Sequence, residues 1–321
     1  MGEGVKSILL GVAVLLLAIS LSACNPDEPA PAGDLSSSLA MVNRTGFPGP
    51  SYERSFVFMT TATDSLLLVP WLLETTLDSN AVFREAHGWV DRDGTWEPFL
   101  AERWQTPPTR YPARILPYGT FRIVVGENDR VDGIIYTDGL RNLELALGRS
   151  VAQWGGPREE RLRLLEASLH LEEQGLNGIV LDMTRLNSSD TPVRGDWAFL
   201  TSGDSLQIVV QGDLEHDIET PPNYRGWGLL DSKELQWPSL RIDWVQVSAY
   251  QPARRDLPIS WALSSPIASV VGTLEVLASE IATGTESGPV LSVQALFEVV
   301  GTISIDGLSF PVRGLFNHRR R

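Results

Sequence analysis

The sequence predicts an all-β protein in which two antiparallel β-barrel or sandwich halves follow one another along the chain. Three observations lead to this fold class. Apolar and polar residues alternate with a period of two between turn residues, which is typical of antiparallel strands. One set of short motifs occurs twice in the same order, which indicates an internal duplication. A leader and a segment rich in proline, glycine and serine precede these repeats.

The leader has the pattern of a bacterial lipoprotein signal. Lys6 precedes an apolar run, which ends at Leu21-Ser22-Ala23 directly before the single cysteine, Cys24. A membrane span and an ordinary secretory signal are the alternatives, but the apolar run is shorter than the ~20 residues that a span needs. We therefore expect residues 1–23 to be removed and the Cys24 thiol to carry a diacylglyceryl group, with membrane lipid as its partner.

Residues 24–50 are predicted to be a disordered tether, because their composition cannot bury enough apolar surface to order itself. Lipid anchoring implies a bacterial cell-envelope location. Asn25 after the cysteine is not the aspartate associated with inner-membrane retention. The outer membrane is therefore favoured if the cell has two membranes.

Composition excludes several classes of function. The formal net charge of −14 argues against a nucleic-acid partner, and a single cysteine rules out an internal disulfide framework. The glycines form neither a dinucleotide-binding fingerprint nor a P-loop. No metal and no cofactor is expected, because the histidines are too scattered for metal-ligand spacing: His87, His170, His216 and His318.

The duplication divides the rest of the chain into two halves, residues 51–189 and 190–321. Matching motifs stand in the same order in both: Phe58-Met59-Thr60 with Phe199-Leu200-Thr201, Gly88-Trp89 with Gly226-Trp227, Arg114 with Arg254, Phe121 with Trp261, and Glu166 with Glu298. We predict roughly eight short strands in each half, the number that closes a small barrel.

Turn residues predict where the strands reverse. Asp93-Gly94, Asn177-Gly178 and Asp306-Gly307 have the composition of tight hairpin turns. Residues 157–174 could instead form a charged amphipathic helix. Their counterpart, residues 293–306, is rich in valine, isoleucine and phenylalanine, which disfavours helix. We therefore predict strands in both segments.

The second half resembles the lipocalin-like family of carotenoid 1,2-hydratases (hydroxyneurosporene synthases) and the attachment-type proteins related to them. Leu257-Pro258-Ile259-Ser260-Trp261 is similar to the family's Tyr-Pro-x-x-Trp strand, Leu274-Glu275-Val276 to the strand that follows, and residues 296–301 to its aromatic-Glu-Gly segment. The resemblance implies two tandem lipocalin-like barrel halves. The family's histidine near the junction of the halves is missing from residues 224–228. The resemblance therefore implies the barrel fold rather than the catalytic activity.

Two similar motifs lie elsewhere. His87-Gly88-Trp89 and Tyr136-Thr137-Asp138 in the first half resemble the family's histidine-containing stretch, although their spacing differs. They are candidates for general acid–base chemistry. Gly203-Asp204-Ser205-Leu206 matches a serine esterase signature, and Asp213 and His216 follow it. Asp and Ser also favour turns, and the other repeat has Thr63-Asp64-Ser65-Leu66 in the same place. We predict that Ser205 is a turn residue and not a nucleophile.

Four aromatic residues are the candidate ligand contacts, with core packing as the alternative: Trp89, Phe121, Trp227 and Trp261. Arg114 and Arg254 are predicted to pair with Glu166 and Glu298 and to close a barrel end. The terminal His318–Arg321 segment is predicted to be a solvated tail that could touch lipid headgroups.

These observations favour a binding protein over an enzyme. The leading hypothesis is a membrane-anchored envelope lipoprotein that holds an apolar small molecule, such as an isoprenoid, fatty acid or lipid, in a lipocalin-like barrel. One alternative is a hydratase- or isomerase-like enzyme acting on an isoprenoid or lipid. The other is a purely structural envelope lipoprotein with filled barrels.

The lipid anchor gives a direct test. Changing Cys24 to Ala removes the thiol that is acylated, so we expect loss of fatty-acid labelling and accumulation of the unprocessed precursor. Metabolic labelling in a bacterial host, followed by membrane fractionation, measures both. A wild-type chain that takes up no label would show that the lipoprotein interpretation is wrong.

Overall fold

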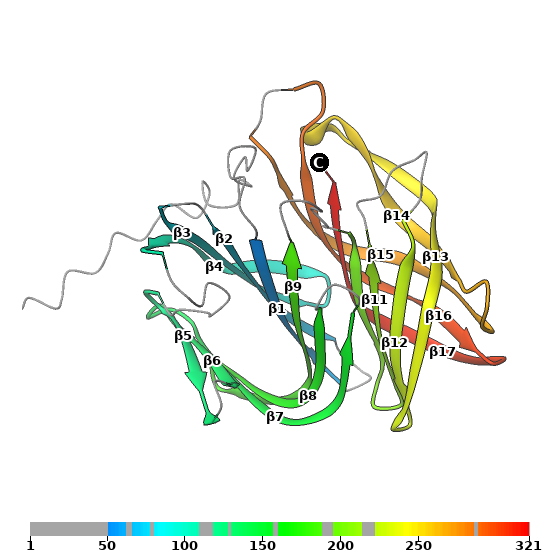
Figure 1. Ribbon diagram of the computed structural model, residues 1–321, viewed down its shortest axis with the longest axis horizontal. Helices are drawn as coiled ribbons and strands as arrows, with labels where there is room; N and C mark the ends of the chain where they lie inside the picture. The colour runs from blue at the N-terminus through cyan, green and yellow to red at the C-terminus, as the bar shows by residue number, and fades with distance from the viewer. Residues whose placement is uncertain are drawn as a thin grey trace, which may run out of the picture. The chain divides into compact units, whose positions relative to one another are not determined.

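The computed structural model describes residues 51–61, 66–77, 80–108, 118–127, 130–156, 160–187, 195–213, 222–285 and 288–320. Within them the chain is all-β and forms two antiparallel sheets (Figure 1). The predicted fold class is confirmed. No helix among these residues is long and apolar enough to cross a membrane.

The first half is a nine-stranded antiparallel sheet in the order β4-β3-β2-β1-β9-β8-β7-β6-β5. Its first strand pairs with its last, so two meanders join at β1 and β9. The strands of this sheet are β1 (Ser51–Thr60), β2 (Leu67–Leu77), β3 (Val82–Arg92), β4 (Thr95–Thr106), β5 (Phe121–Val125), β6 (Val131–Thr137), β7 (Asn142–Gly155), β8 (Arg161–Leu171) and β9 (Gln174–Asn187).

The second half repeats this plan as a closed barrel of β10 to β17 in chain order, in which β10 pairs with β17. A short 3₁₀ helix, η2 (Gln251–Ala253), connects β13 to β14. The strands are β10 (Trp197–Ser202), β11 (Leu206–Gly212), β12 (Tyr224–Leu230), β13 (Lys233–Tyr250), β14 (Arg255–Ser264), β15 (Val270–Thr283), β16 (Val293–Ile305) and β17 (Leu308–Arg320).

Strand β1 shows how the sequence builds two cores at once. Phe56 and Phe58 enter the core enclosed by the first sheet, whereas Val57 and Met59 enter a core shared by the two halves. Side chains alternate between the faces of a strand, so a strand buried on both faces is apolar at successive positions. The shared core therefore requires the continuous apolar run that β1 carries.

Both sheets enclose interiors filled by the protein's own side chains. In the second barrel Trp261 is 1% exposed and stacks on Phe316 with ring centroids 4.4 Å apart. In the first half Phe121 is fully buried, and Phe99 packs against Tyr136 at 5.0 Å. These interiors are packed cores, which is one of the two outcomes expected for barrels of about eight strands.

The repeated Gly-Trp pairs have the same structural role in both halves. An added Cβ at Gly88 would lie 2.5 Å from the Phe99 ring, and one at Gly226 would lie 2.8 Å from the Trp237 ring. Each glycine lets an aromatic ring of the next strand lie against the backbone inside its sheet. The adjacent Trp89 and Trp227 face the other way, into the shared core.

A buried ion network joins the halves at one end of the shared core. Glu53 on β1 accepts hydrogen bonds from Arg185 Nη2 at 2.6 Å and from Arg319 Nη1 at 2.7 Å. Arg185 belongs to β9 of the first half, and Arg319 belongs to β17 of the second. One carboxylate thus bridges the halves, and two cations compensate its loss of hydration.

The predicted hairpins are confirmed at two of three positions. Asp93-Gly94 and Asp306-Gly307 form turns with positive φ at both residues. Asn177-Gly178 instead lies inside β9, and that chain reversal occurs at residues 172–173, where Glu172 has a φ of 57°. A Cβ at residue 178 would lie 2.1 Å from the Met59 carbonyl oxygen, so this glycine permits the close approach of β1 and β9.

The strand predictions for the two disputed segments are also confirmed, as β8 and β16. Several other predictions concern residues outside those the structure describes. They are the signal and tether, including Cys24, the side chain of Arg114, and the boundary between residues 189 and 190.

The Glu53 network yields a stability prediction. Glu53→Ala leaves Arg185 and Arg319 without their shared buried counter-charge, so we expect a loss of about 3–5 kcal/mol in the free energy of unfolding. Urea denaturation of the soluble domain measures this loss. Glu166→Ala is the matched control, because Glu166 is 53% exposed and pairs with an exposed arginine. Equal stabilities of the two variants would contradict the bridging role.

Candidate functional site

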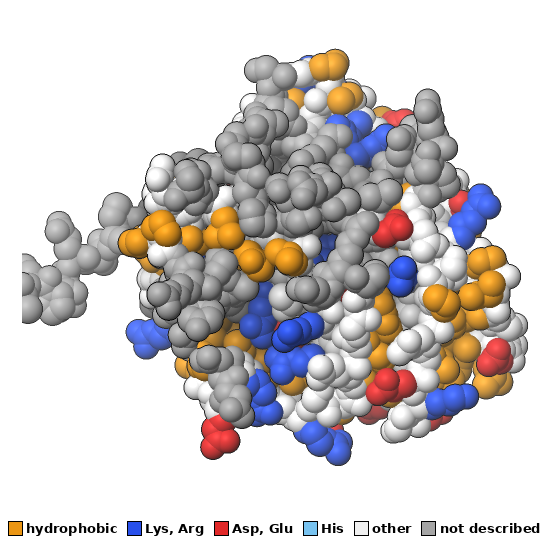
Figure 2. Space-filling view, viewed as in Figure 1, with side chains coloured by type: hydrophobic (Ala, Val, Ile, Leu, Met, Phe, Trp, Pro, Cys, Tyr) orange, Lys and Arg blue, Asp and Glu red, His pale blue; other side chains and the backbone are white. Residues whose placement is uncertain are grey.

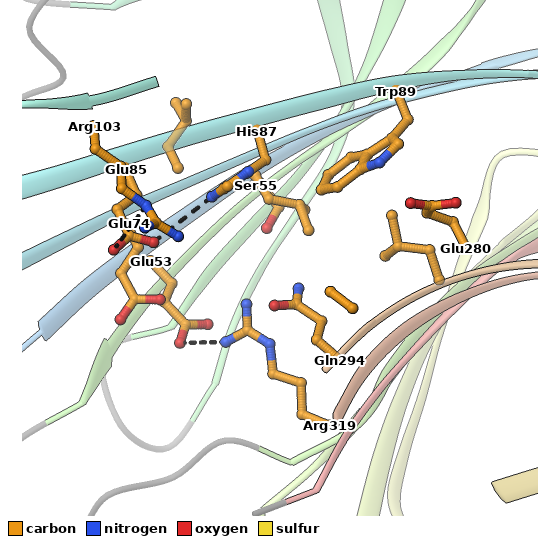
Figure 3. Close-up of a pocket in the computed structure, with 14 residues that line it drawn as sticks. Glu53, Ser55, Glu74, Glu85, His87, Trp89, Arg103, Glu280, Gln294 and Arg319 are labelled. Carbon is orange, nitrogen blue, oxygen red and sulfur yellow. Dashed lines mark hydrogen bonds and ion pairs between the residues drawn. The ribbon is translucent and has the colours of Figure 1, made fainter. Parts of the chain in front are cut away.

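A cavity of about 50 Å³ lies between the two halves, beside the Glu53 network. Strands β1 to β4 form one side of it, and β15, β16 and β17 form the other. Figure 3 shows Glu53, Glu74, Glu85 and Arg103 together at one end and Trp89 with Glu280 at the other. The site is therefore built from the outward faces of both halves.

The apolar part of the cavity wall comes from both halves. Trp89 on β3 and Leu72 on β2 face Leu296 on β16, and all three belong to the shared core. The His87 ring stacks on Trp89 with centroids 5.8 Å apart and an interplanar angle of 18°. This stack joins the apolar wall to the charged end of the cavity.

The charged end on the first half centres on Glu85. Its carboxylate lies 3.6 Å from His87 Nε2 and 3.8 Å from Arg103 Nε (Figure 3). The side chains of residues 85, 87 and 89 share one face of β3, because successive residues of a strand alternate between its faces. Glu85 thus lies within ion-pair distance of both His87 and Arg103.

Glu280 on β15 is the acidic group at the opposite end. Burial raises the pKa of its carboxyl above the ordinary value, and Trp89 opposes that rise. Figure 3 shows the indole nitrogen of Trp89 on the side facing Glu280. A carboxyl with a raised pKa keeps its proton closer to neutral pH, so Glu280 is suited to donate a proton into the cavity.

A second buried acid lies one step further along the same strands. Asp91 on β3 and Glu298 on β16 are each 1% exposed, and Glu298 pairs with Arg313 at 3.2 Å. Burial, then repulsion by Glu298 and their mutual hydrogen bond, raise the pKa of Asp91 to about 7, although the backbone N–H of Gly94 lowers it in part. The interface between the two halves, which we call the seam, therefore contains a pair of carboxyl groups that share a proton.

The four predicted ligand contacts are not brought together. Trp89 lines the cavity, and Trp227 lies in the shared core. Phe121 and Trp261 are buried in the separate interiors of the first and second halves. Their equivalence is also wrong: Tyr136 pairs with Leu143 as Trp261 pairs with Leu274, so Tyr136 is the counterpart of Trp261.

Both predicted glutamates have other partners among the described residues, and the pairing of Arg114 lies outside those residues. Glu166 pairs with Arg149 at 2.6 Å on the surface, and Glu298 pairs with Arg313. Arg254 is exposed in the turn after η2, with a φ of 55°. The predicted Arg254–Glu298 pair is not formed, because Glu298 meets the arginine on the neighbouring strand β17, a partner set by register.

Two further predictions concern turns and termini. Ser205 lies in the turn between β10 and β11, where its hydroxyl donates to the Ser202 carbonyl at 2.7 Å, as predicted. The prediction that the terminal segment from His318 is a solvated tail is wrong. His318 is fully buried, and its Nδ1 lies 3.0 Å from the Asp196 carboxylate. His216 lies outside the described residues. Within the described part of the chain no three His, Cys, Asp or Glu side chains form a metal cluster.

Comparison with known proteins establishes the fold. No family model matches the sequence, and no curated protein matches it. The AttH-type protein of Nitrosomonas europaea matches in structure with a TM-score of 0.56 at 12% identity, over 92% of this chain and 98% of its own. This chain has the tandem lipocalin-like fold.

Two further solved structures share this fold at similar distance. Kievitone hydratase from Nectria haematococca matches with a TM-score of 0.52 at 13% identity, over 84% of this chain and 88% of its own. CghA, solved with Sch210972, matches with a TM-score of 0.52 at 11% identity and the same coverage. The predicted resemblance to the carotenoid hydratase and attachment-type proteins is confirmed for the fold.

Sequence reasoning missed most of the cavity's ionisable residues. Glu53 and Glu280 have no motif around them, and Arg319 belongs to the basic terminal run predicted to be solvated. One signal was present: Glu53 stands just before Phe56–Met59, a run that is apolar at successive positions. A charge inside a strand buried on both faces needs a buried partner. The partner itself, far along the chain, could not be read from that pattern.

The Asp91–Glu298 pair predicts a pH dependence. The pKa of Asp91 rises from 3.8 to about 7 on folding, so the native state holds the proton more tightly than the unfolded chain. The contribution of the Asp91 carboxyl to the free energy of unfolding is fully present below about pH 4 and is lost as the pH rises through about 7. Asp91→Asn keeps a neutral donor to Glu298, so we expect its thermal midpoint to exceed the wild-type value at pH 8 and the gain to shrink at pH 5.

Differential scanning calorimetry across pH 4–9 measures this difference. Asp306→Asn is the control, since Asp306 is exposed in the turn between β16 and β17 and Asn tolerates its left-handed conformation. A gain that is the same at every pH would show that the seam carries no shared proton.

Proposed function

We propose that this protein binds an apolar small molecule with a polar end group, such as a fatty acid, isoprenoid or lipid, in the cavity between its halves. The observation that carries the proposal is the cavity's composition. An apolar wall of Trp89, Leu72 and Leu296 adjoins a charged end that contains Glu85, His87 and Arg103. Binding sites typically combine an apolar lining with a few convergent polar groups that orient the ligand.

The filled interiors favour this location over the inside of either barrel. Trp261, Phe297 and Phe316 occupy the second barrel, and Phe56, Phe58 and Phe121 occupy the first half. The cavity itself, at about 50 Å³, is smaller than the ~150 Å³ that accommodates benzene in a protein core. It would therefore accept the end of a ligand rather than a whole molecule.

The structural neighbours support a small-molecule function for this fold. One of them is named for its hydration of kievitone, and CghA was solved with the compound Sch210972. Their names describe those proteins, and their low identity to this chain leaves its own ligand to be determined by experiment. What they contribute is that the tandem lipocalin-like fold serves small-molecule chemistry.

We also propose an envelope location, on the basis of the predicted lipoprotein signal. A Cys24 anchor with two or more acyl chains would hold the domain at a membrane, where each buried methylene contributes ~0.8 kcal/mol. The tether would let the domain reach molecules at that surface. A carrier or reservoir for compounds that water does not dissolve fits both the anchor and the cavity.

One observation favours an enzyme as the second candidate. The Glu280 carboxyl, whose pKa burial raises, and the His87–Glu85 pair lie at different ends of the same cavity. A proton donor and a proton acceptor on two sides of an apolar molecule are the groups that hydration or double-bond isomerisation needs. Trp89 between them would position the apolar substrate.

Ligand binding is tested by filling the cavity. Ala282 on β15 lines it, so Ala282→Phe should occupy the space and weaken binding at least about tenfold, or ~1.4 kcal/mol. A polyene fatty acid titrated into the soluble domain reports binding through quenching of tryptophan fluorescence. We expect micromolar or tighter affinity for the wild-type domain.

Ala249→Phe is the matched control, because Ala249 is exposed on the outer face of β13. Equal affinity of the two variants would contradict the cavity as the site. No quenching by any fatty acid, isoprenoid or lipid would instead favour the structural lipoprotein. Mass spectrometry of the recovered ligand separates a binder, which returns it unchanged, from an enzyme, whose product should disappear in Glu280→Gln.

A further inference from the structure

A cluster of two arginines and one aspartate lies away from the inter-half cavity, on the concave face of the first sheet. Arg54 on β1 donates to both oxygens of Asp182 on β9, at 2.9 Å from Nε and 2.9 Å from Nη2. Arg163 on β8 donates to the same carboxylate through Nε at 3.1 Å and through Nη2. Three adjacent strands thus contribute to one ion cluster.

The alternation of side chains places this cluster inside the first half. Arg54 shares a face of β1 with Phe56, Arg163 shares a face of β8 with Leu165, and Asp182 shares a face of β9 with Val180; these three apolar residues all belong to the enclosed core. The Arg54 guanidinium lies over the Phe56 ring, 4.7 Å from its centroid. The cluster therefore forms a polar layer directly on top of the core.

The cluster has more positive charge than its ion pairs neutralise. Asp182 is 2% exposed and is the carboxylate that both arginines bind, whereas Arg54 and Arg163 remain 21% and 22% exposed. In the described part of the chain the Nη1 groups of both arginines make no hydrogen bond. Both guanidinium groups thus reach solvent with hydrogen-bond donors that are not yet used.

The surroundings of the cluster leave this surplus in place. On the same face Arg84 of β3 donates to Thr75 Oγ1 at 3.1 Å, and Glu102 of β4 supplies one more carboxylate beyond it. Figure 2 shows basic side chains gathered where Figure 1 places β1, β9 and β8. The net charge of the chain is −14, so it repels anions generally, and this local excess of positive charge is where an anion would be attracted.

We propose that this end of the first half binds an oxyanion, a carboxylate or phosphate group, between the Nη1 donors of Arg54 and Arg163. Planar guanidinium groups match the geometry of carboxylate and phosphate oxygens, and a charge-assisted bond is stronger than one between neutral groups. The site is distinct from the cavity that contains His87 and Glu280.

Thermal unfolding in the presence of anions tests the proposal. Inorganic phosphate, acetate and decanoate are compared with chloride at matched ionic strength, because binding to the native state raises the midpoint. The wild-type domain should be stabilised by phosphate or acetate beyond chloride. A larger effect of decanoate than of acetate would identify the anion as the head of a fatty acid, and a phosphate effect alone would identify a phosphate group.

Two substitutions move the response in opposite directions. Arg163→Gln removes one guanidinium and should weaken anion binding about tenfold. Asp182→Asn removes the competing carboxylate and should strengthen binding, an effect that a purely structural ion cluster would not produce. Ala249→Phe, on the exposed outer face of β13, should leave the anion response unchanged. The decanoate comparison is made in Ala282→Phe, so that binding in the inter-half cavity does not contribute. Stabilisation equal to that by chloride, or an Asp182→Asn response weaker than wild type, would overturn the proposal.

Discussion

The carboxylate of Glu53 determines how the two halves meet. It accepts hydrogen bonds from Arg185 of the first half and from Arg319 of the second, in a region that excludes water. Arg185 also donates to the Gly195 carbonyl at 3.1 Å, and the next residue, Asp196, accepts from the Arg319 backbone N–H. The network therefore joins three parts of the chain at one point. They are strand β1, the residues that lead into β10, and strand β17. Because buried ions tolerate little displacement without losing their partners, this network sets the separation of the cavity walls beside it.

The seam contains ionisable groups because it is formed by the outward faces of the two halves. The cavity is lined by the outward faces of two barrel-like halves, faces that a single barrel would expose to water. Docking of one half on the other buries some of their polar side chains along with apolar ones. Glu280, the His87–Glu85 pair and the Asp91–Glu298 pair are such groups. A tandem arrangement thus generates a desolvated acid–base environment without any polar residue having to enter a barrel core.

Local patterns in the sequence predict the fold well and the site poorly. Gly88-Trp89 and its repeat mark equivalent positions, because one face of each strand must admit an aromatic ring. Asn177-Gly178 has turn composition, yet its glycine serves the approach of two strands. His318 resembles a tail residue because the basic residues around it give no sign of burial. Alternation reveals that a strand has two faces but not which second sheet covers the outer one. The residues of the cavity are for that reason predictable only once the partner strands are known.

The pairing of first strand with last also determines when each half can be completed. Strand β1 finds its second partner only in β9, and β10 finds its own only in β17. During synthesis from the N-terminus, β1 and β2 can pair early, while the other edge of β1 waits for nearly the entire half. Such distant pairing slows folding and leaves an unpaired strand edge exposed meanwhile. Each half thus reaches its native state in a single late step, and a chain released before its last strand lacks both a closed sheet and the wall that strand supplies.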